Sequence, residues 1–279
     1  MALADVNGAK LWYQTIGQGE PLLLHHGYTA CRDNWQPVAE RLKDDYQVIM
    51  MECRGAGESE DTAGGYNLNQ YAADVIGLVD YLGIDTFTYA GHSMGGGIGY
   101  LLAVDYMARL NKLILMAPIP SGGLAGEIDA AAIDARLAAR DAGNRDFFKR
   151  EMEAMRFRPD VQTDAWFESR VDQLMRVSEA HVRDGVQTMH DLDVERQLGG
   201  VSIPVLMIAG AVDGLLSHNL ADFALFPDAT LQVFSHAGHE VAIHEPDGVA
   251  AAIDNFMQMG VVTGAKLLDR ALSHASADQ

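Results

Sequence analysis

The sequence predicts an α/β fold in which a mostly parallel central sheet is covered by helices on both faces. Short apolar segments alternate with longer helical segments over residues 10–120, and the alternation resumes at residue 203. Strands that are apolar on both faces are typical of parallel sheets buried between helices. Between these two regions the sequence is helical and amphipathic, which predicts an insertion of about 80 residues into one sheet domain.

The first part of the chain supplies most of the predicted strands. Apolar runs predict strands over residues 10–16, 21–26, 46–53, 86–90 and 110–118. Helices are predicted over residues 34–45 and 67–83, and a glycine-rich helix follows the strand at 86–90. After the insertion, the pattern predicts strands over 203–211 and 229–234 and helices over 217–226 and 246–258.

These elements divide the chain into four predicted parts. Residues 1–119 and 200–260 form the two parts of the sheet domain, and residues 120–199 form a helical cap between them. The cap takes its apolar faces from residues such as Phe147, Phe148, Met152 and Trp166. Residues 261–279 form a C-terminal tail with a short helix, to which we assign no function.

Composition restricts the partners of the protein. The 279 residues carry a net charge of −19, which repels nucleic acid and acidic membrane surfaces. No apolar stretch approaches the roughly 18 residues that a membrane span needs. Asp5 falls where a signal peptide would need its apolar region, so we expect a cytoplasmic protein that binds a small molecule.

A serine surrounded by glycines marks the candidate site. In TYAGHSMGGG (88–97), Gly91 and Gly95 lie two residues before and after Ser93. A serine hydroxyl becomes an effective nucleophile when it is exposed on a sharp strand-to-helix turn beside a base, and the close approach of the chain in such a turn requires very small neighbours. A predicted strand precedes Ser93 and a predicted helix follows it, so we interpret Ser93 as a nucleophile.

With this context, residues 8–258 resemble the α/β-hydrolase superfamily. The resemblance rests on HHG after an early strand, GHSMGG at the turn, an inserted helical region, and an acid and a histidine late in the chain. It implies the α/β-hydrolase fold with a helical cap. Members of this family order their catalytic residues as nucleophile, acid, histidine.

The resemblance assigns the acid and the base. Asp213 follows the first strand after the insertion, where its carboxylate would orient an imidazole. An Asp-Gly turn is the alternative interpretation of this residue. His239, between the last strand and the last helix, is expected to be the base, although His236 and His244 lie close by. His92 is expected to point away and support the turn.

The family also implies an oxyanion hole made of backbone N–H groups. The residue after the nucleophile, Met94, would donate one N–H, and Tyr28, after the His-Gly pair, would donate the other. One segment departs from the family pattern: ECRGAGES (52–59) has Glu52 and Ala56 where the family has Asp and His, which weakens any transfer of substrate from relatives that keep the full motif.

No metal or cofactor is expected. The segment HEVAIH has one residue too many for the zinc motif H-E-x-x-H, so its histidines would point apart on a helix. No phosphate-binding glycine loop is present in the sequence.

These observations predict a serine hydrolase of the carboxylesterase or lactonase type. The resemblance to the family implies a monomer or homodimer. The apolar cap suggests an uncharged, fairly hydrophobic ester or lactone, with Trp166 and Phe167 as candidate lining residues, although such aromatics more often serve packing. A carbon–carbon bond hydrolase and a cofactor-free perhydrolase would use the same residues. A receptor that holds a small ligand without turnover is the alternative from a different class.

Overall fold

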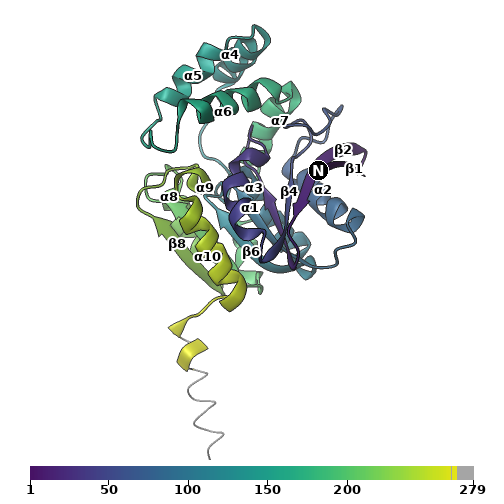
Figure 1. Cartoon of the computed structure of the whole chain (residues 1–279), viewed down its shortest axis with the longest axis vertical. Coiled ribbons are helices and arrows are strands. Elements are labelled where there is room, and N and C mark those ends of the chain that lie inside the picture. Colours follow the sequence, from purple (N-terminus) through teal and green to yellow (C-terminus); the bar gives the residue numbers. More distant parts are fainter. Residues whose placement is uncertain (265, 269–279) are drawn as a thin grey trace, which may run out of the picture.

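The computed structural model of the chain describes residues 1–264 and 266–268 (Figure 1). Its centre is an eight-stranded sheet in the order β1-β2-β4-β3-β5-β6-β7-β8. The pairs β1–β2 and β2–β4 are antiparallel and all other pairs are parallel. The strands are β1 (Ala2–Val6), β2 (Ala9–Ile16), β3 (Glu20–His25), β4 (Tyr46–Met51), β5 (Phe87–His92), β6 (Leu110–Met116), β7 (Val205–Gly210) and β8 (Ala229–Phe234).

Helices cover both faces of this sheet, as predicted. On one face pack α1 (Gln36–Leu42), the short α9 (Val241–His244) and α10 (Pro246–Met259). On the other face pack α2 (Leu68–Tyr81), α3 (Met94–Asp105) and α8 (Leu216–Phe223). The fold class predicted from the sequence is therefore confirmed.

The central strands bury side chains on both faces. In β3, Leu23 belongs to one apolar core, while Leu22 and Leu24 belong to the other. In β6, Leu113 and Ile114 are divided between the two cores in the same way. This alternation explains why the strands appear in the sequence as continuous apolar runs instead of alternating apolar and polar residues.

Strand β1 was not expected from the sequence. It pairs with β2 through a tight hairpin in which Asn7 and Gly8 have φ angles of 49° and 75°. Such left-handed conformations favour an Asn-Gly pair, so this dipeptide was the local signal for the hairpin. Only two of the five β1 residues, Ala4 and Val6, are buried, which explains why the strand has no continuous apolar run.

Between β6 and β7 the chain forms the helices α4 (Ala130–Asp141), α5 (Arg145–Glu153), α6 (Asp164–Arg176) and α7 (Glu179–His190), which lie together at one end of the molecule (Figure 1). Each begins with a side chain that accepts a hydrogen bond from a backbone N–H three residues later, and these residues are Asp129, Asn144, Thr163 and Ser178. Their apolar faces form two small cores of their own. We call α4–α7 the cap helices; the domain boundaries given above stay a prediction.

Polar contacts attach the cap helices to the rest of the fold. The Ser178 N–H donates to the Gly55 carbonyl at 2.8 Å. The buried His181 on α7 shares a 2.8 Å hydrogen bond with the Tyr71 hydroxyl of α2. Arg158, in the loop before α6, donates to the Glu245 carboxylate at 2.9 Å, near the start of α10. The cap helices are thus attached to both parts of the sheet domain.

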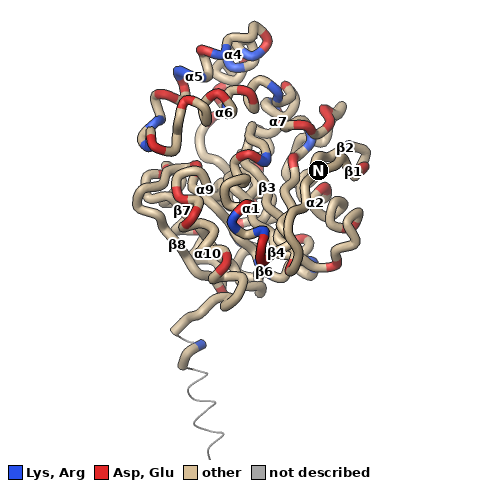
Figure 2. Tube along the Cα trace, in the orientation of Figure 1, with Lys and Arg blue, Asp and Glu red and all other residues tan. Residues whose placement is uncertain are grey.

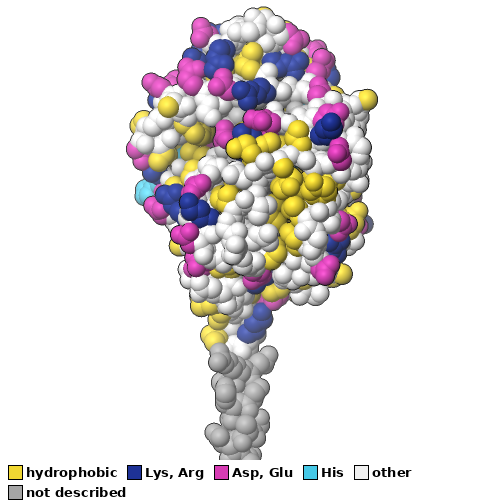
Figure 3. All heavy atoms as spheres, turned by 45° about the vertical axis from the view of Figure 1, so that its right-hand side comes forward, with side chains coloured by type: hydrophobic (Ala, Val, Ile, Leu, Met, Phe, Trp, Pro, Cys, Tyr) yellow, Lys and Arg dark blue, Asp and Glu magenta, His cyan; other side chains and the backbone are white. Residues whose placement is uncertain are grey.

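Charged side chains lie mainly on the surface. In Figure 2 the basic and acidic residues of α4–α7 alternate, and the space-filling view in Figure 3 shows both signs mixed over the upper part of the molecule. None of the helices in the described part of the chain is long and apolar enough to cross a membrane. Most of the predicted C-terminal tail, residues 269–279, lies outside the described residues.

One ion pair is buried inside the sheet domain, and it leads to a prediction about stability. Arg54 donates to both carboxylate oxygens of Asp74 at 2.8 and 2.9 Å, and the two side chains are 5% and 0% exposed. Removing one partner leaves an uncompensated buried charge. We expect Asp74→Ala to lower the free energy of unfolding by about 3–5 kcal/mol, measured by chemical denaturation.

The matched control is Asp134→Ala, which removes an exposed partner of Arg183. It should cost less than about 1 kcal/mol, because solvent screens surface pairs. Equal losses in the two variants would show that the Arg54–Asp74 pair contributes no more than a surface contact.

Candidate active site

Ser93 lies on a sharp turn between β5 and α3. Its φ of 55° and ψ of −115° form a backbone conformation that side chains other than glycine rarely adopt. The Ser93 N–H donates to the Met116 carbonyl at 3.0 Å, which ties the turn to the neighbouring strand. The turn places the side chain at the carboxyl end of the sheet, where ligands bind in open α/β folds.

The glycines around Ser93 are required by close backbone contacts. A Cβ atom on Gly91 would collide with the backbone of Gly95 and Gly96. A Cβ atom on Gly95 would lie 2.7 Å from the carbonyl oxygens of both His25 and His26. These contacts explain why glycines lie on both sides of Ser93 in the sequence.

The three residues predicted to act together lie within hydrogen-bond distance of one another. His239 Nε2 is 2.9 Å from Ser93 Oγ, and His239 Nδ1 is 2.9 Å from Asp213 Oδ2. The other Asp213 oxygen accepts the Leu215 N–H at 3.1 Å. Asp213 follows β7 and His239 follows β8, so the carboxyl ends of three strands supply the three side chains.

The histidines that compete with His239 have other contacts. The exposed His236 lies in the turn after β8, and its carbonyl accepts a hydrogen bond from Arg158. His244 Nδ1 accepts the Gly238 N–H at 3.2 Å. His92 Nε2 lies 2.8 Å from the His239 carbonyl, so this ring supports the loop that carries His239.

Charge and burial act against each other at this site. Burial alone would lower the pKa of His239, but the hydrogen bond and negative charge of Asp213 outweigh it and raise that pKa above 6.5. Burial alone would raise the pKa of Asp213, but the hydrogen bond and charge of His239 lower it below 3.8. The pair therefore favours an ionised carboxylate beside an imidazole that readily takes up a proton.

The loop after β3 lies against the serine. A Cβ atom on Gly27 would be 3.0 Å from Ser93 Cβ. Tyr28 is the next residue after Gly27 in this loop. Among the described residues, neither the Tyr28 N–H nor the Met94 N–H has a protein acceptor. Both groups are thus available to a ligand oxygen. The Tyr28 hydroxyl points elsewhere and donates to the Val182 carbonyl of α7 at 2.5 Å.

A cavity of about 470 Å³ lies between the cap helices and these loops. Asp213, His239 and Glu240 line its lower side, and Trp166 and Phe167 of α6 line its upper side. Both aromatic residues proposed from the sequence therefore face the cavity that contains His239. Within residues 1–264 and 266–268, no three His, Cys, Asp or Glu side chains form a group that could hold a metal ion.

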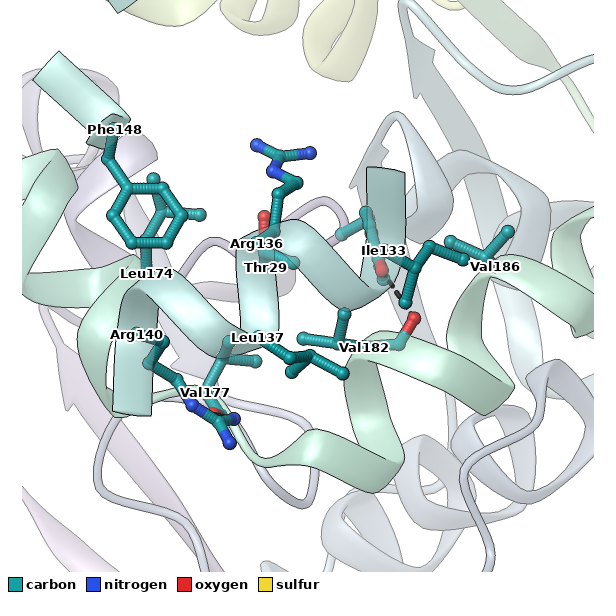
Figure 4. A pocket seen from close by; sticks show the side chains of 11 residues that line it. Thr29, Ile133, Arg136, Leu137, Arg140, Phe148, Leu174, Val177, Val182 and Val186 are labelled. Carbon is teal, nitrogen blue, oxygen red and sulfur yellow. Dashed lines mark hydrogen bonds between the residues drawn. The ribbon is translucent and has the colours of Figure 1, made fainter. Parts of the chain in front are cut away.

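A smaller apolar pocket of about 70 Å³ adjoins this cavity, and Arg136 and Leu174 line both. Figure 4 shows Leu137, Val177 and Val182 around it, with the guanidinium groups of Arg136 and Arg140 at its edges. Tyr28 also lines this pocket, and its hydroxyl donates to the Val182 carbonyl. Tyr28 thus has its side chain between cap helices and its backbone beside Ser93.

Glu240 and Arg170 are two charged residues of the cavity that are not among the candidates from the sequence. Glu240 directly follows His239, and this adjacency is the local signal for its position in the cavity. Arg170 lies three residues after Phe167 on α6, so helical spacing places both on one face.

Comparison with known proteins identifies the family. The α/β hydrolase fold family matches residues 20–246. The 3-oxoadipate enol-lactonase 2 of Acinetobacter baylyi is 30% identical over 264 residues, covering 88% of this chain and 92% of that protein. A non-heme haloperoxidase of Rhodococcus erythropolis is 25% identical, covering 90% of this chain and 97% of that protein. The chain belongs to the α/β hydrolase fold family.

A solved structure agrees with this conclusion about the fold. The enol-lactonase of Burkholderia xenovorans superposes with a TM-score of 0.81 at 20% sequence identity, covering 92% of this chain and 99% of that one. The family and these relatives show that the protein is a hydrolase-fold enzyme.

The contact between Asp213 and His239 leads to a prediction about the pKa of His239. Since the Asp213 carboxylate raises the pKa of His239, Asp213→Asn should lower that pKa. The His239 ring protons, followed by NMR against pH, would report the change. Asp228→Asn, at an acid that pairs instead with Lys266, is the control and should leave the His239 titration in place. An unchanged or higher pKa in Asp213→Asn would contradict the described geometry.

Proposed function

We propose that the protein is a serine hydrolase that cleaves a carboxylic ester or lactone through an acyl-enzyme on Ser93. The observation that supports this most strongly is the continuous hydrogen-bonded series from Ser93 Oγ through His239 to Asp213. Nucleophile, base and orienting acid in contact are the arrangement that activates a serine. The names of the enol-lactonase relatives point to the same reaction class.

In the proposed first half-reaction, His239 Nε2 takes the proton of the Ser93 hydroxyl as the oxygen attacks the carbonyl carbon. Asp213 stabilises the imidazolium that forms. The carbonyl oxygen becomes negatively charged and accepts hydrogen bonds from the Tyr28 and Met94 N–H groups. His239 then gives its proton to the alcohol oxygen as the carbon–oxygen bond breaks.

In the second half-reaction, water replaces the alcohol. His239 removes a proton from water, the hydroxide attacks the acyl carbon, and Ser93 leaves with the proton from His239. In an ester the alcohol departs before this step, whereas in a lactone the acyl and alcohol groups remain joined. The cavity under Trp166 and Phe167 encloses the substrate during both steps and limits its contact with bulk water.

This mechanism predicts that a fluorophosphonate probe labels Ser93. The wild-type protein should be labelled and should hydrolyse short and medium-chain 4-nitrophenyl esters. Ser93→Ala and His239→Ala should lose labelling and lower kcat by roughly 10⁴-fold or more, since residues of such a triad act as a unit. Mass spectrometry of the labelled peptide identifies the site.

Measurements of secondary structure determine how an absence of labelling and turnover is interpreted. Circular dichroism should show that both variants keep the wild-type secondary structure. Absence of labelling and turnover in a folded wild-type protein would reject the hydrolase and favour a receptor that binds without turnover. Cleavage of a vinylogous diketone in preference to every ester would favour a carbon–carbon bond hydrolase.

The mechanism also predicts the direction of the pH dependence. The base must be neutral to accept the serine proton, and the pKa of His239 is raised above 6.5. The value of kcat/KM should therefore rise with pH, with an acid limb centred above pH 6.5, and should be low where His239 is protonated. An acid limb below pH 6 in a stable protein would show that another group acts as the base.

Perhydrolysis is a second candidate, favoured by the similarity to the non-heme haloperoxidase over nearly the whole chain. Hydrogen peroxide would attack the acyl-enzyme in place of water, releasing a peracid and regenerating the Ser93 hydroxyl. Measuring peracid formation with an ester and peroxide, in wild type and Ser93→Ala, tests this. Peracid formation that persists in Ser93→Ala would exclude this route.

A further inference from the structure

The cavity lined by Asp213 and His239 has charges of opposite sign on its two sides. The cap helices and the loop before α6 contribute the guanidinium groups of Arg136, Arg156 and Arg170. The loops of the sheet domain contribute the carboxylates of Asp213 and Glu240. This distribution was not expected for a site that takes an uncharged, hydrophobic substrate.

Two of the three arginines form ion pairs with acids of the cap helices. Arg136 lies 3.2 Å from the Glu151 carboxylate. Arg156 lies 2.8 Å from Asp164 and 2.9 Å from Glu153. Their charges are compensated within the cap by these carboxylates, while Arg156 Nε is a buried donor without a partner among the described residues.

Arg170 differs because its hydrogen-bond acceptors are neutral. Its Nη1 donates to the Thr29 carbonyl at 2.6 Å and to Gln173 Oε1 at 3.3 Å, and its Nη2 donates to Thr29 Oγ1 at 3.1 Å. No carboxylate of the described residues lies within ion-pair distance of this guanidinium. Burial lowers the pKa of Arg170, which reflects the cost of removing the charge from water.

The position of Arg170 relates it to the reacting group. Thr29, which it contacts, directly follows Tyr28, the predicted oxyanion donor beside Ser93. Arg170 also lines the same cavity as His239. An anionic group a few bonds away from the attacked carbonyl would therefore be in reach of the guanidinium.

Glu240 is the charge that could oppose such a group. Its Oε2 accepts a hydrogen bond from Asn34 Nδ2 at 2.5 Å on the sheet-domain side of the cavity. Its negative charge partly compensates Arg170 from a distance, without a direct ion pair. An anionic ligand is thus directed away from Glu240 and toward the cap side, where the arginines lie.

We propose that Arg170 binds a carboxylate on the substrate, so that the preferred ester or lactone carries a negative charge. A guanidinium matches a carboxylate in shape and can donate two parallel hydrogen bonds to it. The inference rests on the proposed hydrolysis at Ser93 and replaces the uncharged substrate expected from the sequence. The hydrogen bonds from Arg170 to Thr29 attach α6 to the loop after β3. A neutral donor could make the same hydrogen bonds, so this attachment does not explain the charge of Arg170.

The test compares two substrates that differ by one charge. These are 4-nitrophenyl hydrogen adipate and its neutral methyl ester, and the readout is the ratio of their kcat/KM values. The wild-type protein should prefer the anionic substrate. Arg170→Gln, which keeps amide donors but loses the charge, should lower the ratio by roughly 10- to 100-fold, the range for a lost charge-assisted hydrogen bond. Arg170→Lys should lower it less.

Arg183→Gln is the matched control, since it removes a surface arginine of α7 that lies outside the cavity. It should keep the wild-type ratio. If Arg170→Gln lowers kcat/KM for both substrates by the same factor, Arg170 only docks α6, and the proposal is overturned. A wild-type ratio near or below one would also overturn it, while leaving ester hydrolysis established.

A binding measurement separates this inference from the proposed function. Adipate binding is followed by calorimetry with the wild-type protein and Arg170→Gln. Binding that is weakened roughly 10-fold or more in Arg170→Gln supports the carboxylate site even if neither ester is hydrolysed, in which case the proposed function alone fails. Equal binding to both proteins overturns the site.

Discussion

The backbone turn at Ser93 is the constraint on which the arrangement of the site depends. Its positive φ occurs at the single residue between the end of β5 and the start of α3, so Met94 is the first residue of that helix. This geometry exists because Gly91 and Gly95 leave room for backbone contacts that any Cβ atom would prevent. The loop that contains Gly27 also packs closely against Ser93. Strain at one residue is therefore maintained by packing on all sides, as expected where backbone strain occurs at functional sites.

The rest of the site depends on holding a partly buried imidazole in one orientation. His239 receives its partners from segments far apart in the sequence, since Ser93 is 146 residues away. His92 supports the His239 carbonyl, and Asp213 fixes the ring through Nδ1. Burial opposes a positive charge on this imidazole, and the Asp213 carboxylate offsets this cost. The support from His92 and Asp213 leaves Nε2 directed at the serine.

The sheet domain and the turn at Ser93 could be predicted because their signals are local, whereas Asp213 and His239 were assigned through the resemblance to the α/β-hydrolase family. Apolar runs identify strands that are buried on both faces, and the glycine spacing identifies the turn. The signal of β1 was weaker, because a half-exposed edge strand lacks a continuous apolar run. Arg170 could not be assigned a role from the sequence, because its partner Thr29 is 141 residues away and the packing of the cap helices decides which residues face the cavity. Periodicity places Trp166 and Phe167 on a helix, but it does not specify what that helix covers.

The central claim is that catalysis proceeds through a covalent bond to Ser93, and trapping this intermediate tests it most directly. The protein would be mixed with an excess of 4-nitrophenyl acetate, quenched with acid on the millisecond scale and digested for mass spectrometry, while released nitrophenolate is followed in parallel. The account predicts a burst of about one nitrophenolate per enzyme and an acetyl group on the peptide that contains Ser93. Steady turnover with the Ser93 peptide unmodified throughout, or an acetyl group found on a different residue that turnover requires, would contradict it.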